Sequence, residues 1–87
     1  MNFSKALTYL KLGNKIARSG WNGKNMWLIY IEGTNITTPE GTPYNNAGLE
    51  EITIDPHIDM YTAQGTMQPG WLASQSDLLA EDWEVSN

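Results

Sequence analysis

Apolar positions near the start of the chain recur with the spacing of a helix. Four residues follow the i, i+3, i+4, i+7 pattern that places side chains on one helical face: Phe3, Ala6, Leu7 and Leu10. Asn2 is a suitable N-cap, and Gly13 can take the left-handed conformation that ends a helix. The pattern therefore predicts an amphipathic helix over residues 3–12.

Two strand-like runs follow, Lys15–Trp21 and Lys24–Ile31, with Asn22-Gly23 between them. Asn-Gly is the strongest short-range hairpin signal, because a type I′ turn needs positive φ at both central residues. Met26–Ile31 is apolar throughout, which indicates a strand covered on both faces. The N-terminal helix can cover one face of this strand, and another subunit is a candidate to cover the opposite face. We therefore expect a buried central hairpin.

The composition shifts from Glu32 to Glu51 toward Gly, Thr, Pro and Asn, with few apolar side chains. Loops of about twenty residues without regular structure are uncommon in compact domains. Those that occur usually serve as lids, binding loops or interface arms. We expect an irregular segment here with one of these roles.

The rest of the chain predicts short elements. Four runs read as strands, the first two separated at a proline: Glu51–Ile54, His57–Thr62, Thr66–Trp71 and Asp82–Val85. Ser74 and Asp77 match a capping box, so a helix of one or two turns should start near Gln75. The expected fold is a single α+β domain over residues 1–87, a small antiparallel sheet with an N-terminal helix and a short C-terminal helix.

Length and composition narrow the class of protein. Eighty-seven residues suffice for one domain with a small core, and such domains often gain burial by forming oligomers. Without cysteine, disulfides, zinc–thiolate sites and iron–sulfur clusters are excluded. The sequence has neither a membrane-span run nor the pattern of a signal peptide. We therefore expect a protein that works in the cytoplasm, away from membranes.

Charge is segregated along the chain. All five basic residues lie in the first 24 positions, all ten acidic residues lie from Glu32 onward, and the net charge is −5. An acidic chain is a poor general binder of DNA or RNA, whose affinity depends on phosphate neutralisation. A few early cations can still hold one small anion if they converge on a pocket. The favoured interpretation is that Lys5, Lys11 and Lys15 lie on a solvent-exposed face of the helix and beside it.

Asp55, His57 and Asp59 alternate, so on a strand they would project from one face. A histidine flanked by carboxylates suits a metal site or an oriented general base. Pro56 disturbs the alternation, and three mixed ligands rarely bind a transition metal tightly. Hydrogen bonding at a strand end is the favoured alternative, so we expect no metal or cofactor.

The tip of the predicted hairpin gathers groups that suit a nucleotide: Arg18, Trp21, Asn22 and Lys24. An indole offers a stacking face for a base, and the two cations can donate charge-assisted hydrogen bonds to phosphate. The alternative is that Trp21 packs against the end of the core and that its neighbours are simply residues that favour a turn. The residue types support both interpretations equally.

A second group surrounds the start of the C-terminal helix: Trp71, Ser74, Gln75 and Asp77. A helix start presents unpaired N–H groups that attract anions, and the hydroxyl and amide groups add neutral donors. Asp77 would repel a phosphate, so helix capping is the favoured alternative.

Catalytic signatures are missing from the sequence. It contains no cysteine nucleophile, no Gly-x-Ser-x-Gly, and no Walker or dinucleotide glycine fingerprint. No spacing marks a pair of carboxylates for acid–base work. Nine aromatic residues, four of them Trp, favour binding over turnover. We therefore expect a binding protein and not an enzyme.

Several blocks of the sequence together carry a family resemblance: Met1–Leu7, Ala17–Lys24, Pro56–Met60 and Trp71–Val85. The chain resembles the Thoeris anti-defence proteins of the second type, a small phage and prophage family. The resemblance covers nearly the full length except Glu32–Glu51. It implies a non-enzymatic sponge that binds a cyclic ADP-ribose signal, such as glycocyclic ADP-ribose, made by TIR-domain enzymes of bacterial Thoeris defence. It also implies homotetramers with pockets between subunits, in the cytoplasm of the infected host, and in some members binding of cyclic di- or oligonucleotides.

The resemblance also implies roles for motif positions. Trp21 or Trp71 would stack on the adenine, while Arg18 and Lys24 would neutralise the pyrophosphate. Four residues would satisfy ribose hydroxyls: Asn22, Ser74, Gln75 and Asp77.

Other functions remain open at this point. One is a direct protein–protein inhibitor of a defence enzyme, whose partner would co-purify without nucleotide. Another is a small hydrolase that uses His57 with Asp55 or Asp59. A phage structural role would require extended assemblies.

Overall fold

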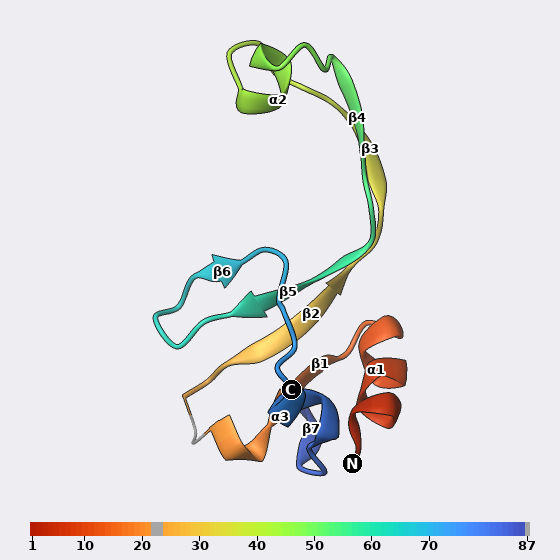
Figure 1. The fold of residues 1–87 in the computed structure, drawn as a ribbon, viewed down its shortest axis with the longest axis vertical. Helices are drawn as coiled ribbons and strands as arrows, with labels where there is room; N and C mark the ends of the chain where they lie inside the picture. Colours follow the sequence, from red (N-terminus) through yellow and green to blue (C-terminus); the bar gives the residue numbers. More distant parts are fainter. Residues whose placement is uncertain (22–23, 87) are drawn as a thin grey trace.

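The computed structural model describes residues 1–21 and 24–86 (Figure 1). It begins with helix α1, Phe3–Lys11, which confirms the predicted N-terminal helix. The Asn2 side chain accepts a hydrogen bond from the backbone N–H of Lys5 at 2.9 Å, as an N-cap should. Gly13 has a φ of 100°, which places it in the left-handed region and ends the helical run.

An antiparallel sheet of five strands forms the body of the protein, in the order β6-β5-β2-β1-β7. The strands are β1 Lys15–Arg18, β2 Trp27–Ile31, β5 His57–Tyr61, β6 Met67–Gln68 and β7 Trp83–Ser86. Ile16 lies opposite both Leu28 of β2 and Val85 of β7, so β1 is an interior strand of the sheet. The α+β class with an antiparallel sheet is confirmed.

The central pair β1 and β2 is antiparallel, as expected, but its strands are shorter than predicted. Residues Ser19–Trp21 form a 3₁₀ helix (η1), and β2 begins only at Trp27. The backbone N–H groups of Ser19 and Gly20 donate to Asp82, which turns the chain away from the strand direction. The predicted turn residues, Asn22 and Gly23, lie outside the described residues.

The core lies between α1 and one face of the sheet. Its fully buried side chains are Ala6, Leu10, Ile16, Leu28 and Trp83. Side chains alternate along a strand, so Trp27 and Ile29 of β2 lie on the opposite face, where they are only half-buried. The chain thus covers one face of β2 and leaves the other open.

The segment Glu32–Glu51, which was predicted to be irregular, is instead part of a projecting hairpin, so that prediction was wrong, whereas the predicted strand Glu51–Ile54 is confirmed. Strands β3, Thr34–Thr37, and β4, Glu51–Ile54, pair antiparallel with Ile36 opposite Ile52, and a short helix α2, Pro43–Asn46, lies at the tip. The overall extents are 44 × 26 × 25 Å, and the radius of gyration of 15.4 Å exceeds the roughly 12 Å typical of a compact chain of this length. We call residues 32–55 the arm (Figure 1).

The C-terminal elements follow the prediction in part. Helix α3, Gln75–Leu79, begins with the predicted capping box between Ser74 and Asp77. The predicted strand Thr66–Trp71 is real only at Met67–Gln68, because the chain turns at Gly70, whose φ is 76°. No helix in residues 1–21 and 24–86 is long and apolar enough to cross a membrane.

Candidate ligand site

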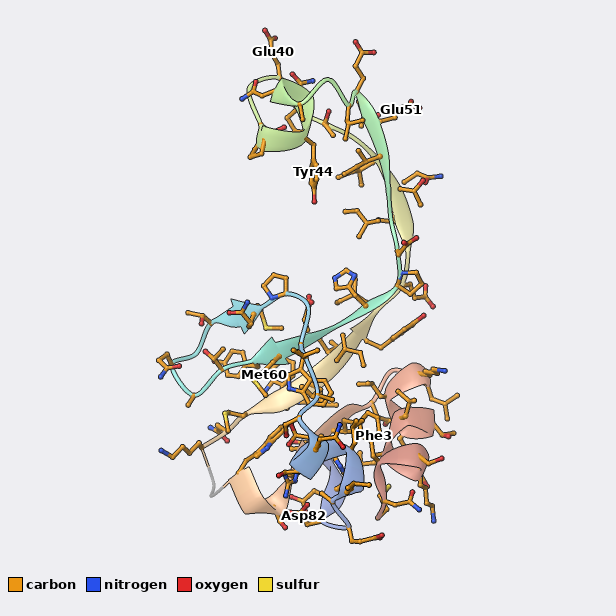
Figure 2. All side chains as sticks on the ribbon, in the orientation of Figure 1. Phe3, Glu40, Tyr44, Glu51, Met60 and Asp82 are labelled. Carbon is orange, nitrogen blue, oxygen red and sulfur yellow. The ribbon has the colours of Figure 1, made fainter. Side chains whose placement is uncertain are left out.

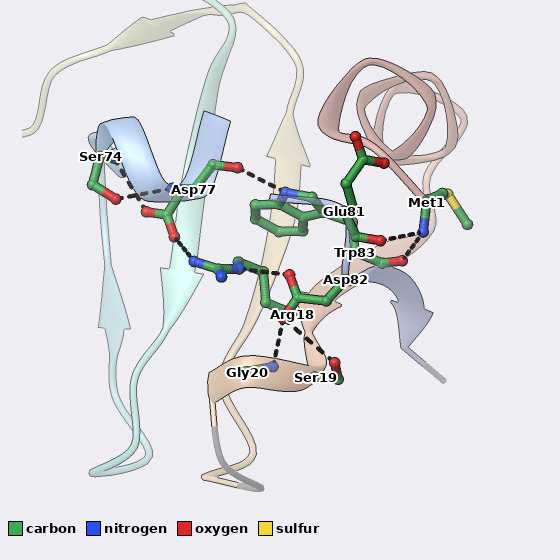
Figure 3. Close-up of polar contacts among 9 residues, drawn as sticks. All are labelled: Met1, Arg18, Ser19, Gly20, Ser74, Asp77, Glu81, Asp82 and Trp83. Carbon is green, nitrogen blue, oxygen red and sulfur yellow. Dashed lines mark hydrogen bonds and ion pairs between the residues drawn. The ribbon is translucent and has the colours of Figure 1, made fainter. Parts of the chain in front are cut away.

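The guanidinium of Arg18, at the end of β1, lies between two carboxylates (Figure 3). Its Nη1 donates to Asp77 Oδ1 and its Nε to Asp82 Oδ1, both at 2.9 Å. Asp82 Oδ2 also accepts from the backbone N–H of Gly20 at 2.7 Å. A side chain at Gly20 would place its Cβ 2.7 Å from the same oxygen, so the Asp82 carboxylate would have to shift to accommodate it.

These contacts shift the ionisation of all three groups. The pKa of Arg18 is raised because Asp82 and then Asp77 accept its hydrogen bonds. Burial pushes the pKa of Asp77 upward, but the hydrogen bonds from Arg18 and Ser74 together outweigh it and leave the pKa below its usual value. The Arg18 hydrogen bond, followed by that of Gly20, lowers the pKa of Asp82. The cluster therefore stays ionised at neutral pH.

Trp83 of β7 connects this ion-pair cluster to the aromatic core. Its Nε1–H donates to the carbonyl oxygen of Asp77 at 2.8 Å. Trp21 and Trp71 both pack edge-on against its ring, with centroids 5.4 and 6.1 Å away. One side of Trp21 and one side of Trp71 therefore already pack in the core, and both side chains are half-buried.

The residues at the start of α3 serve mainly as a cap. Ser74 Oγ accepts from the Asp77 N–H, and the Ser74 N–H donates to Asp77 Oδ2, each at 3.1 Å. Gln75 is exposed. The only charged partner of this segment among the described residues is Arg18, through Asp77.

A cleft of about 270 Å³ opens where β1 and β7 meet the segment after η1. Its lining comprises Ala17, Arg18, Ser19, Trp21, Lys24, Asn25, Met26, Glu84 and Ser86. Three residues of the predicted hairpin-tip group therefore share one cleft, whereas the fourth, Asn22, lies outside the described residues. The second predicted group, around Trp71 and Ser74, does not line it.

Sequence reasoning missed the contribution of β7 to this cleft. Glu84 and Ser86 reach it because they pair with Ala17 and Lys15 of β1. It also missed Asp82, which accepts from Arg18 and Gly20. No local signal marks these residues, because only the pairing of the first strand with the last brings them here.

The His57 cluster forms strand-end contacts. His57 Nε2 lies 3.3 Å from Asp59 Oδ1, and its Nδ1 lies 2.9 Å from the backbone oxygen of Asp55. Asp59 Oδ1 also accepts from the Gly70 N–H at 3.0 Å. Within the described part of the chain, no group of three histidine or carboxylate side chains is placed to hold a metal ion.

A larger hollow, of about 510 Å³, lies along the two strands of the arm. Its lining is neutral or acidic: Asn35, Ile36, Thr37, Glu51, Ile52 and Thr53. A phosphate-bearing ligand is bound most strongly by cations, which this lining lacks. The smaller cleft, with its indole and its lysine, is therefore the better candidate for an anionic ligand.

The fold and cleft describe a small α+β domain, and comparison with known proteins adds its family. The Thoeris anti-defense 2-like domain family matches residues 1–86. Thoeris anti-defense 2 of Bacillus phage SP01 is 36% identical over 85 residues, which cover 98% of this chain and 93% of the phage protein. The chain belongs to the Thoeris anti-defense 2-like family, and this membership supports a phage anti-defence role.

Proposed function

We propose that the protein binds and sequesters a cyclic ADP-ribose isomer, such as glycocyclic ADP-ribose, without cleaving it. Such a signal would come from the TIR enzymes of Thoeris immunity, and cyclic di- or oligonucleotides are further candidate ligands. The observation that carries the proposal is the cleft in which Trp21 and Lys24 lie together beside β7. Family membership supports the same role.

The cleft offers one group for each part of such a ligand. The Trp21 indole offers an apolar surface for adenine, and the exposed Lys24 ammonium supplies positive charge for the pyrophosphate. Ser19, Asn25 and Ser86 offer polar groups for ribose hydroxyls. Arg18 already donates to two carboxylates, so its proposed role is to hold the cleft wall while Lys24 meets the phosphate.

The small volume of the cleft is relevant to the oligomeric state of the protein. Pockets for ligands of this size usually hold about 300–1,000 Å³, and the cleft holds about 270 Å³. We therefore propose that a second copy of the chain completes the site, in a homo-oligomer such as the tetramer that the family resemblance implies. A sponge also needs tight binding and not turnover, and the described residues that line the cleft include no histidine and a single carboxylate, Glu84.

Calorimetric titration with cyclic ADP-ribose isomers and cyclic dinucleotides tests the proposal. We expect tight binding of one ligand, weaker binding at higher salt, and at least tenfold weaker binding by K24A. K5A is the matched control, because Lys5 is an exposed lysine on α1 away from the cleft. Denaturing the complex should return the ligand unchanged.

Three results would contradict the proposal. Recovery of a cleaved product would indicate an enzyme, and H57A would then test the hydrolase alternative. Equal losses in K24A and K5A would exclude the cleft as the site. No heat with any ligand would favour a protein partner, which should then co-purify without nucleotide.

A further inference from the structure

Glu84 places a carboxylate in the candidate cleft. It lies opposite Ala17 in the pairing of β7 with β1, and both residues line the cleft. The Ala17 side chain is too short to cover the carboxylate, and Glu84 itself is exposed. Among residues 1–21 and 24–86, no basic side chain forms an ion pair with it. No direct contact therefore compensates the charge of Glu84.

The cations near Glu84 differ in their partners. Arg18 already donates to two carboxylates. Lys15 lies on the same sheet face as Glu84, but its ammonium is 5.1 Å from the centroid of the Trp27 ring. Lys24 lines the cleft, is exposed and has no ion-pair partner in the part of the chain that the structure describes. Lys24 is therefore the cation that a phosphate in the cleft would meet.

The cleft and its wall together carry excess negative charge. Arg18 and the two aspartates that it contacts sum to one negative charge, because all three groups are ionised at neutral pH. Lys24 and Glu84, the other ionisable residues of the described lining, add one charge of each sign. One ammonium thus attracts an anionic ligand, while Glu84 repels every further negative charge that the ligand brings close.

The acidic residues of the arm are too distant to produce this repulsion. Figure 2 shows Glu40 and Glu51 at the tip of the arm and Asp82 at the opposite end of the molecule. The molecule is 44 Å long, and physiological salt screens charges over about 8 Å. The repulsion in the cleft therefore comes from nearby groups, of which Glu84 is the carboxylate that lines it.

Nucleotide phosphates fall into two classes by charge. In a cyclic ADP-ribose isomer or a cyclic dinucleotide, every phosphate bridges two groups and carries a single negative charge. The terminal phosphate of ADP or ATP is bonded on one side only, and its second ionisation, at a pH of about 6, gives it nearly two negative charges at neutral pH. ADP therefore offers the same adenine and pyrophosphate as cyclic ADP-ribose, with one additional charge.

We propose that Glu84 is a specificity-determining residue, which makes the cleft select nucleotides whose phosphates are all bridged and reject those with a terminal phosphate. This inference rests on the proposed function, because it concerns the same site. Lys24 attracts the ligand, and Glu84 limits the charge that the ligand can carry. Such selection matters for a sponge, because cellular ADP and ATP present the same adenine and pyrophosphate groups and would otherwise occupy the cleft.

Competition calorimetry with ADP and its β-methyl ester, each displacing the bound cyclic ADP-ribose isomer, tests this role. The ester keeps the adenine and the pyrophosphate, and its methyl group removes the second charge of the terminal phosphate. At pH 7.5 the wild type should bind the ester at least about threefold more tightly than ADP. E84Q keeps the size of the side chain without its charge, so it should bind the two with nearly equal affinity. E81Q is the control and should keep the wild-type ratio, because Glu81 is an exposed acid that does not line the cleft.

A variant of the lysine separates attraction from selection. K24Q should weaken the binding of both ADP and its ester, because it removes the ammonium that meets the phosphate. It should retain the preference for the ester, because Glu84 is still present. Loss of that preference in K24Q would contradict the role assigned to Glu84.

The outcomes separate this inference from the proposed function. Equal affinity of the wild type for ADP and its ester would overturn the inference without any variant. An unchanged ratio in E84Q, shown to be folded by circular dichroism, or an equal fall in E81Q would also overturn it. Tight binding of the cyclic isomer alongside any of these results would leave sequestration standing. No binding of any nucleotide would overturn both.

Discussion

Arg18 donates to Asp77 at 2.9 Å, although the two residues are 59 positions apart in the sequence. This bond joins the end of β1 to the first turn of α3. The partly buried side chains of both residues, 20% and 13% exposed, allow little solvent to compensate for its loss. Arg18 thus stabilises the wall behind the candidate cleft.

Replacing Arg18 should therefore reduce stability. R18M keeps much of the aliphatic side chain but leaves Asp77 and Asp82 without their guanidinium. We expect a loss of about 1 kcal/mol, which corresponds to a fall in Tm of about 4–8 °C for a chain of this size. K11M, at the exposed end of α1, should change Tm by much less. Equal Tm values for the two variants would contradict a structural role for Arg18.

The lowered pKa values of Asp77 and Asp82 predict acid sensitivity. Their folded-state pKa values lie below the ordinary 3.8, so the unfolded chain binds protons first as pH falls. The stabilisation is present above the ordinary pKa and is lost as pH falls through the folded-state values. Urea unfolding between pH 6 and pH 3 should show a shallower decline for D82N than for the wild type. E81Q, which removes an exposed carboxylate, should follow the wild type, and a parallel decline in D82N would refute the assignment.

Trp83 should be sensitive even to a conservative change. W83F removes the Nε1–H that donates to Asp77 and leaves space in a core where Trp83 is 1% exposed. We expect a loss of about 2–3 kcal/mol in the free energy of unfolding, measured by urea titration. W27F is the matched control, because Trp27 is half-buried and keeps an aromatic stack with Tyr61. A loss in W27F as large as in W83F would contradict this explanation.

Thr38 should stabilise the arm locally. It is 6% exposed, and its Oγ1 donates to the carbonyl oxygen of Leu49 at 2.6 Å, which ties the two sides of the arm together. T38V keeps the shape and loses this bond, so amides of β3 and β4 should exchange hydrogen about fivefold faster. T34V, at an exposed position, is the control. Unchanged exchange in T38V would show that the bond contributes nothing to the arm.

The sequence predicted the elements that depend on local signals. Asn2 before α1 and the Ser74–Asp77 box before α3 act within four residues, so their geometry can be read from spacing. The arm was predicted only in part: Glu51–Ile54 was expected as a strand, but β3 is rich in Thr and Asn, and its register depends on a partner strand some 16 residues away at Ile36 and Ile52.

The candidate site was likewise predictable only where its residues lie close together in the sequence. Arg18, Trp21 and Lys24 are close in the chain, and the structure brings them to one cleft. The two acids that hold Arg18, and the β7 residues that complete the cleft, come from distant positions. Ion pairs between residues so far apart produce no recognisable pattern in the sequence. The acids that bind Arg18 and the β7 residues of the cleft can therefore be identified only from the three-dimensional fold.

The pairing of β1 with β7 also has a consequence for folding kinetics. Ile16 must find Val85, roughly 70 positions later, before β1 gains its second neighbour and Trp83 enters the core. Closing so long a loop costs entropy before any contact compensates for it, and such topologies fold in milliseconds to seconds instead of microseconds. The chain should therefore expose β1 and its apolar neighbours until its last strand arrives, and loss of that strand would leave β1 as an unpaired edge of the sheet.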